Sequence, residues 1–223
     1  VKAEDVDWSG IDVAFGCLPH GTSQDLIETL PSHVKVVDLS SDYRFRDAVA
    51  YSKAYGREHI APERTAKAIY GLSEHAADAM KGADLVACPG CYPTAVLMVL
   101  LPLMQPMIID QDAIIIDAKS GASGAGRGLK EGNLFCEVTE GVHAYGVGTH
   151  RPTPEIEQEL NLRAGRDDAA DLLIHAVDHG RMNSHLGGLE PALLVRQLES
   201  LTDPNLGDQP YKAELIRLKV KHQ

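Results

Sequence analysis

An apolar run, a tight turn, a cysteine and a second apolar run follow one another between residues 85 and 101, LVACPGCYPTAVLMVLL. The first run is short enough for a buried strand, and Pro89 with Gly90 breaks it. The second run, from Thr94 onward, is long enough for a helix. This succession places Cys91 at a sheet edge and at a helix start, where backbone N–H groups and a partial positive charge favour an anion. Cys91 is therefore a candidate nucleophile that can form a thioester with an activated carbonyl.

Other interpretations of Cys91 remain open at this point. A cysteine between apolar segments is more often a small buried side chain. Cys88 and Cys91 also form a C-x-x-C pair, which occurs in redox proteins and in zinc sites. Cys17 and Cys136 are single, so no second pair completes a zinc site, and we expect no metal. A redox pair and a buried side chain stay as alternatives to a nucleophile.

The net charge of −11 and the absence of a basic stripe argue against a nucleic-acid partner. Hydrophobic residues make up 44% and charged residues 24% of the 223-residue chain, which is typical of a globular protein. No apolar run reaches the roughly 18 residues of a membrane span, so no membrane partner is expected. Four cysteines do not make a disulfide scaffold, and this favours a reducing compartment. The opening residues, which lack an initiator Met and a signal peptide, indicate a chain that continues a longer protein.

The segment from Ile11 to Ser40 predicts a β-α-β unit. IDVAFGC (11–17) has the pattern of a strand, SQDLIETL (23–30) that of a helix capped by Thr22 or Ser23, and VKVVDLS (34–40) that of a second strand. Strands joined in this way run parallel, and ligands gather at their carboxyl ends. We therefore expect Leu18 to Gly21 and Ser40 to Asp42 to share one rim. For either segment taken alone, a polar surface loop is the favoured interpretation.

Residues 43–75 lack a clear period, and we interpret them as an irregular excursion toward a second domain. LVAC (85–88) then reads as the third strand and AIIIDAKS (113–120) as the fourth. The glycine-rich stretch 121–128 is not a P-loop, because it lacks the G-K-[ST] ending. Its glycines let backbone N–H groups approach an anion, and three side chains add donors: Ser120, Ser123 and Arg127. A flexible surface loop is the alternative.

His150 and Arg151 precede a helix that starts near Glu155, with prolines at its first turn. His150 is a candidate general base, and Arg151 is a candidate clamp for a carboxylate or a phosphate. The later chain is less clear. AADLLIHAV (169–177) predicts a strand or a short helix, residues 180–201 a helix, residues 202–210 a turn-rich linker and AELIRLKV (213–220) a last short element.

Taken together, the segments resemble the N-acetyl-γ-glutamyl-phosphate reductases of arginine biosynthesis, over residues 11–160. Their joint order and spacing carry the resemblance: LPHGTSQ (18–24), VKVVDLSSDYRFRD (34–47), YG (55–56), AIYGLSE (68–74), PGCYPT (89–94), IIDAKSGASGAGR (115–127), FCEV (135–138) and HRPTPEIEQEL (150–160). The wider superfamily includes aspartate-semialdehyde dehydrogenase, which shares the cysteine after the turn. The DLSSDYR, AKSGASGAG and TPEIEQ segments favour the acetylglutamyl-phosphate enzyme.

The resemblance implies a mechanism. Cys91 would attack the acyl carbon of the substrate, phosphate would leave, and hydride from NADPH would give N-acetyl-glutamate 5-semialdehyde. His150 best matches the acid–base position, and Arg151 remains the candidate substrate clamp. The implied cofactor rim comprises Pro19, His20, Gly21 and Ser40. The resemblance also implies a segment near the cofactor and the substrate, formed by Ser120, Gly121, Ser123 and Gly124. Ser120 is implied to contact the substrate as well.

Four departures from the family pattern matter. The family's G-x-x-G-x-x-G, which cradles the NADP pyrophosphate, would precede residue 1. Cys88 stands where the family usually has Asn, and Pro152 replaces the second His of H-R-H-x-P-E. If that second His is the main acid–base group, Glu155 or His150 must replace it. The tail after about Ala164 has no match.

We therefore expect an α/β fold, with a partial Rossmann-type parallel sheet in residues 1–90 and an α+β substrate and dimerisation domain in residues 91–223. The expected function is NADP-dependent reduction of N-acetyl-γ-glutamyl phosphate by a homo-oligomer, in the cytoplasm or an organelle stroma. The alternatives are a truncated, non-catalytic relative, an aspartyl or aminoadipyl phosphate reductase, and, ranked last, a thiol-redox protein.

Overall fold

The computed structural model describes residues 2–104, 109–111, 114–139, 142–144, 150–165, 172–179 and 215–219. The chain forms two compact units. The first comprises residues 1–105 and 151–169, and the second residues 106–150 and 170–223. Each unit is described by itself below. The helix predicted for residues 180–201 and the linker predicted for residues 202–210 lie outside the described residues.

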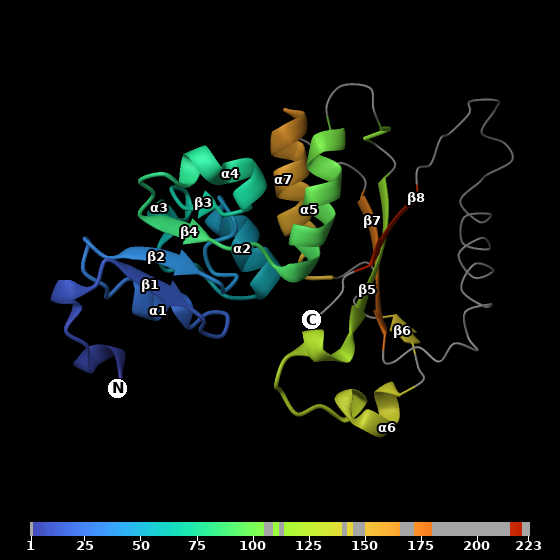
Figure 1. Ribbon diagram of the computed structural model, residues 1–223, viewed down its shortest axis with the longest axis horizontal. Coiled ribbons are helices and arrows are strands. Elements are labelled where there is room, and N and C mark those ends of the chain that lie inside the picture. The colour runs from blue at the N-terminus through green and yellow to red at the C-terminus, as the bar shows by residue number, and fades with distance from the viewer. Residues whose placement is uncertain are drawn as a thin grey trace, which may run out of the picture. The chain divides into compact units, whose positions relative to one another are not determined.

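A four-stranded parallel sheet organises the first unit. Its strands are β1 (Val13–Gly16), β2 (Lys35–Asp38), β3 (Ile69–Tyr70) and β4 (Leu85–Ala87). They lie in the order β1-β2-β4-β3, and every pair is parallel (Figure 1). Helix α1 (Ser23–Ile27) connects β1 to β2, which confirms the predicted β-α-β unit. Two short 3-10 turns, η1 (Ala3–Asp5) and η2 (Trp8–Gly10), precede β1.

The core of this unit forms where the apolar faces of β2 and β4 meet side chains from α1 and from the segment after β2. Strand residues alternate faces, so Val36, Leu85 and Ala87 are buried while their neighbours are more exposed. Ile27 of α1 and Tyr43 pack in the same cluster. Burying such side chains is the main favourable term in folding.

The prediction of an irregular excursion over residues 43–75 is wrong. This segment contains α2 (Ala48–Tyr55), α3 (Pro62–Thr65), strand β3 and the start of α4 (Ser73–Met80), and β3 pairs with β4 inside the first sheet. Asp47 caps α2 by accepting from the N–H groups of Val49 and Ala50, and Gly56 ends α2 with φ 68°. These elements are too short to show a hydrophobic period, since β3 has two residues and the helices have four to eight. As a result LVAC is the fourth strand along the chain and not the third.

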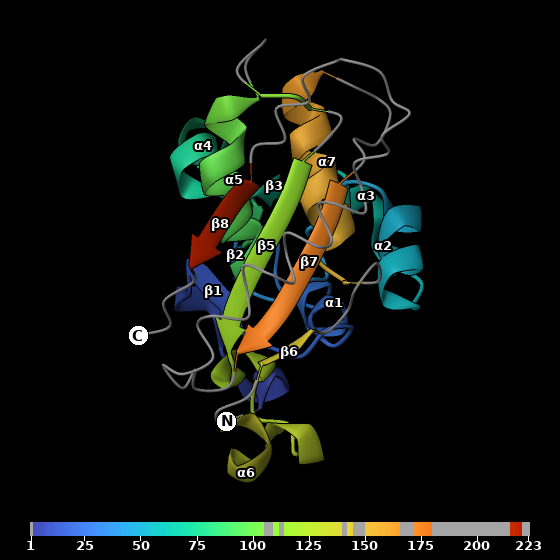
Figure 2. The ribbon, with the colours of Figure 1, turned by 90° about the vertical axis from the view of Figure 1, so that its right-hand side faces the viewer.

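Helices α5 (Cys91–Leu103) and α7 (Thr153–Ala164) pack side by side in the first unit (Figures 1 and 2). Helix α5 is apolar on most sides and buries Val96, Leu97 and Leu100, while Ile156 and Leu160 of α7 are fully buried. Helix α5 begins at Cys91 itself, three residues before the predicted start. Helix α5 belongs to the same compact unit as the first sheet. The predicted domain boundary, between residues 90 and 91, would instead have assigned α5 to the second domain.

The second unit contains a mixed sheet with the order β6-β7-β5-β8 (Figure 2). Its strands are β5 (Ile114–Gly121), β6 (Val142–Ala144), β7 (Leu172–His179) and β8 (Leu215–Lys219). Strand β5 is parallel to β7 and β8, and β6 is antiparallel to β7. The remaining described elements are η3 (Ala122–Ala125), η4 (Glu131–Asn133) and α6 (Phe135–Val138). Of the element predicted at 169–177, residues 172–177 lie in strand β7 and not in a helix, and residues 169–171 lie outside the described residues.

Together the two sheets confirm the predicted fold class, a parallel Rossmann-type sheet followed by an α+β part. Among the described residues, no helix is both long and apolar enough to cross a membrane.

A buried histidine makes the stability of the first unit depend on pH. His59 is 5% exposed; its Nδ1 accepts the N–H of Ala61 at 3.0 Å, and its Nε2 lies 2.7 Å from the carbonyl oxygen of Asp42. Burial lowers the pKa of His59 from its ordinary value of 6.5. A second proton, on Nδ1, would also point at the Ala61 N–H, which disfavours the charged ring. The unfolded chain takes up a proton near pH 6.5 and the folded chain does not. The free energy of unfolding should therefore fall as the pH drops below about 6.5.

Urea unfolding at pH 7.5, 6.5 and 5.5 measures this dependence, and the His59 ring resonances report its pKa directly. His59→Gln removes the titrating group, so its free energy of unfolding should fall less over the same range. An unchanged pH dependence in that variant would contradict the assignment.

Candidate functional site at the carboxyl edge of the first sheet

Three polar segments meet where the parallel strands of the first sheet end. They follow β1, β2 and β4 and contain His20, Ser41 and Cys88 respectively. The Ser41 N–H donates to His20 Nδ1 at 3.2 Å and joins the first two segments. The Cys88 N–H donates to the carbonyl oxygen of Asp38 at 2.7 Å and joins the third to the second. The first two segments, predicted to share one rim, are joined by hydrogen bonds.

The buried carboxylate of Asp42 holds the loop after β1. Its two oxygens accept the Gly21 N–H at 2.7 and 2.9 Å, and it also accepts the Gln24 N–H at 3.2 Å and the Tyr51 hydroxyl at 3.0 Å. Gly21 has φ 80°, a conformation that a residue with a Cβ rarely adopts. The N–H of this predicted cofactor residue is thus already bonded within the protein.

Ser40, another predicted cofactor residue, is also committed to internal bonds. Its hydroxyl donates to Asp38 Oδ2 at 2.6 Å and accepts the Asp42 N–H at 3.0 Å, and the side chain is buried. Pro19 is exposed in the turn before Gly21, where its carbonyl oxygen accepts the Thr22 N–H. Ser40 and Gly21 therefore hold the backbone of the rim through hydrogen bonds within the protein.

His20 is an imidazole held in a defined orientation on this rim. Because the Ser41 N–H donates to Nδ1, that nitrogen is an acceptor and the proton of the neutral ring lies on Nε2. Partial burial and the positive charges of Arg44 and Arg151 lower the pKa of His20, so the ring is neutral at pH 7. The ring packs against Tyr55 with centroids 5.6 Å apart. His20 therefore presents a hydrogen-bond donor at Nε2.

Cys91 is exposed and is the first residue of α5, with Gly90 as the N-cap. Its Pro89-Gly90 turn is held at both ends. Nε of Arg44 donates to the carbonyl oxygen of Cys88 at 2.7 Å, and Oε1 of Glu155 accepts the Gly90 N–H at 3.1 Å. The two holding groups form an ion pair with each other at 3.4 Å, between Nη1 of Arg44 and Oε2 of Glu155. The cysteine thus sits on a turn whose position a buried ion pair determines.

Glu155 is fully buried on the first turn of α7. Besides Arg44 and Gly90, its carboxylate accepts the Tyr70 hydroxyl at 2.7 Å. Burial raises the pKa of Glu155, while Arg44 and the two hydrogen bonds oppose that rise. The Gly90 N–H and Arg44 connect this carboxylate to the turn before Cys91, and in this structure Glu155 therefore acts as a positioning group.

The remaining predicted residues divide between the two units. Arg151 is exposed in the first unit, and its charge acts on His20 and Tyr55. Ser120 and Gly121 end strand β5, Ser123 and Gly124 lie in η3, and His150 is buried, all in the second unit. The Ser120 hydroxyl donates to the carbonyl oxygen of Gly121 at 3.1 Å.

Sequence reasoning gave no individual role to three residues that hold this site, namely Asp42, Arg44 and Tyr70. A signal was present, because Asp42 and Arg44 follow directly after a predicted strand. Within the described part of the chain, no group of three or more His, Cys, Asp or Glu residues is placed to hold a metal ion.

Comparison with known proteins identifies two domains in sequence. Residues 1–83 match the NAD-binding domain of semialdehyde dehydrogenases, and residues 91–182 match their dimerisation domain. A solved structure of aspartate semialdehyde dehydrogenase II from Vibrio cholerae superposes with a TM-score of 0.54 at 13% identity, covering 80% of this chain and 55% of that one. At that identity the likeness concerns the fold alone.

Among curated proteins, an N-acetyl-gamma-glutamyl-phosphate reductase from Rhodospirillum rubrum is 52% identical over 183 residues, covering 80% of this chain and 52% of that protein. A probable chloroplastic reductase of the same name from Oryza sativa is 52% identical over 164 residues, covering 74% of this chain and 40% of that protein. The chain thus spans about half the length of the curated relatives that it matches.

Removing the negative charge of Glu155 should destabilise the first unit. In Glu155→Gln the Arg44 guanidinium stays buried without its counter-charge, which typically costs about 3–5 kcal/mol of unfolding free energy. Urea denaturation at pH 7.5 measures the loss. Asp78→Asn breaks the exposed Lys81–Asp78 pair and serves as a control with a much smaller effect. An equally small effect of Glu155→Gln would show that the carboxyl group is already neutral.

Proposed function

Because this chain belongs to the semialdehyde dehydrogenase family, we propose that it reduces N-acetyl-γ-glutamyl phosphate to N-acetyl-glutamate 5-semialdehyde through a thioester on Cys91. The observation that carries the proposal is the position of Cys91. This cysteine is exposed at the N-terminus of α5, on a turn held by Arg44 and Glu155. The identity to reductases of that name supports the choice of substrate.

In the first step, Sγ of Cys91 attacks the acyl carbon of the substrate. A C–S bond forms, the C–O bond to phosphate breaks, and inorganic phosphate leaves. Negative charge develops on the acyl oxygen during the attack, and the first N–H groups of α5 offer hydrogen bonds and a partial positive charge to it. Sulfur suits both halves of the reaction because it is a good nucleophile and a good leaving group.

NADPH, when bound, would supply the hydride that takes the thioester carbon to the oxidation level of an aldehyde. The tetrahedral species on Cys91 then collapses, the C–S bond breaks and the aldehyde is released. We assign the proton transfers to His150, and the binding of a substrate carboxylate or phosphate to Arg151 and Ser120. Glu155 supports the reaction by holding the Gly90 N–H beside Cys91.

The cofactor proposed is NADP(H), and the residues of the first unit fit part of its site. The match of residues 1–83 to an NAD-binding domain and the rim at the ends of β1 and β2 support this location. Nε2 of His20 and the guanidinium of Arg151 provide donors there, whereas Gly21 and Ser40 bond to Asp42 and Asp38 and act as scaffold. We assign further contacts to Ser120, Gly121, Ser123 and Gly124, and a shaping role to Pro19.

The match of residues 91–182 to a dimerisation domain supports a homo-oligomer as the working form. Two relatives are named as chloroplastic, which supports an organelle stroma as one location. The cytoplasm is the other location that we propose. One observation favours a second candidate, a relative without activity. Pro152 occupies a position where the reductases' motif has a histidine.

Assay of the reverse reaction separates these candidates. The purified chain is mixed with N-acetyl-glutamate 5-semialdehyde, inorganic phosphate and NADP, and absorbance of the reduced nicotinamide is followed. We expect reduction that falls at least about 10³-fold in Cys91→Ser, because the thioester cannot form. Cys88→Ser is the matched control and should keep the order of magnitude of the rate. No reduction by a chain that circular dichroism shows to be folded would favour the inactive relative.

The choice of dinucleotide is tested in the same assay. With NAD in place of NADP, we expect a lower kcat/KM. Replacing the acetylated aldehyde by aspartate semialdehyde tests the alternative substrate class, and a higher kcat/KM with that aldehyde would reassign the substrate.

A further inference from the structure

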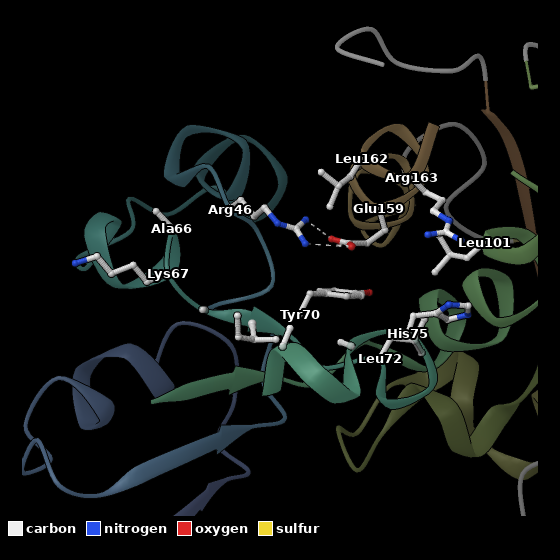
Figure 3. A pocket seen from close by; sticks show the side chains of 14 residues that line it. Arg46, Ala66, Lys67, Tyr70, Leu72, His75, Leu101, Glu159, Leu162 and Arg163 are labelled. Carbon is white, nitrogen blue, oxygen red and sulfur yellow. Dashed lines mark hydrogen bonds and ion pairs between the residues drawn. The ribbon is translucent and has the colours of Figure 1, made fainter. Parts of the chain in front are cut away.

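A pocket of about 500 Å³ opens in the first unit between β3, α4, α5 and α7 (Figure 3). Its volume is within the range of small-molecule sites in proteins, about 300–1,000 Å³. None of the residues assigned to the reaction above lines it. Its walls come from the segment before α2, the segment after α3, strand β3 and the three helices, so the pocket is built entirely from the first unit.

The lining of this pocket carries a net positive charge in a protein whose net charge is −11. Arg46, Lys67 and Arg163 are its cations, and Glu159 is the one acid among its described lining residues. Arg46 and Glu159 neutralise each other in a two-pronged ion pair, with Nη2 and Oε2 at 3.2 Å. Lys67 and Arg163 have no ion-pair partner within the described ranges. The pocket therefore has cationic groups available to an anion.

The positive charge of Arg163 lies at one end of the pocket (Figure 3). Arg163 from α7 and His75 from α4 lie on the same side, with Leu101 of α5 between them, whereas Lys67 points away. The Tyr70 ring lies beside them, and the Arg46–Glu159 ion pair lies between that ring and Leu162. A negatively charged head would thus meet Arg163 and His75, and an apolar body would lie against Tyr70 and Leu101.

Tyr70 also connects the pocket to the Cys91 turn. Its hydroxyl donates to Oε1 of Glu155 at 2.7 Å, and the same oxygen accepts the Gly90 N–H at 3.1 Å. Burial and the charge of Glu155 raise the pKa of Tyr70, so its hydroxyl stays protonated and donates throughout the physiological pH range. Anything that orders the Tyr70 ring from the pocket side acts on the carboxylate that holds the turn.

We propose that this pocket binds a small carboxylate with an apolar body, and that its occupancy stabilises the Cys91 turn through Tyr70 and Glu155. A guanidinium and an imidazole offer donors to one carboxylate, and the aromatic and aliphatic walls favour an apolar chain. Coupling follows because a ligand that packs on Tyr70 favours the state in which its hydroxyl bonds Glu155. The proposal does not depend on the reaction assigned to Cys91.

Binding is tested with hexanoate as the probe and hexanamide as its neutral match, by titration of the ¹⁵N-labelled full chain. We expect saturable shifts at Leu72, His75 and Arg163 with hexanoate, and binding about tenfold weaker for Arg163→Gln, since a charge-assisted hydrogen bond is lost. Lys81→Gln removes an exposed charge that does not line the pocket and should leave the affinity unchanged. Equal binding of hexanamide, an unchanged affinity in Arg163→Gln, or saturation by inorganic phosphate alone would overturn the proposal.

Coupling is tested by amide hydrogen exchange at Gly90. Saturating hexanoate should slow exchange of this N–H about fivefold, the lower end of typical coupling between sites. In Tyr70→Phe hexanoate should still bind but leave the Gly90 exchange rate unchanged, because the hydroxyl link is missing. An unchanged exchange rate in the saturated wild-type chain would refute the coupling, whatever the outcome of the reductase assay.

Discussion

The buried ion pair between Arg44 and Glu155 determines how the carboxyl edge of the first sheet is built. Moving both charges out of water is costly, and the cost is offset only if each group finds further partners. Arg44 donates hydrogen bonds to the carbonyl oxygens of Leu39 and Cys88. Glu155 accepts hydrogen bonds from the Tyr70 hydroxyl and the Gly90 N–H. Those partners lie at the ends of β2 and β4, in β3 and on the turn before Cys91. One electrostatic requirement thus fixes several backbone segments at once.

Asp42 has a similar role on the neighbouring segment. Its carboxylate accepts from Gly21, Gln24 and Tyr51, while its own carbonyl oxygen bonds His59. Burying a carboxylate is tolerated because hydrogen bonds replace its lost water. Buried acids thus hold the loops of this rim from inside the protein. The Gly21 N–H already bonds Asp42, and the Ser40 hydroxyl already bonds Asp38.

Much of this architecture could be predicted from local patterns. The β-α-β unit and strand β5 have clear apolar runs, and the P-G break before Cys91 marks the start of α5 closely. Strand β3 could not be found in this way, because two residues show no alternation. The site was predictable only in part. Cys91, His20 and Glu155 belong to recognisable segments, but the pairing of Arg44 with Glu155 depends on residues 111 positions apart, which no local pattern encodes.

That separation has a consequence for the order of assembly. The first unit receives α7 only after the chain has passed through residues 106–150 of the second unit. During synthesis, Arg44 and the Pro89-Gly90 turn leave the ribosome long before Glu155. Closing so long a loop costs entropy before the ion pair forms, so we expect these contacts to form late in folding. A nascent chain that stops before residue 155 therefore contains every strand of the first sheet but lacks the carboxylate that holds the turn before Cys91, so this turn reaches its final position only when α7 has been made.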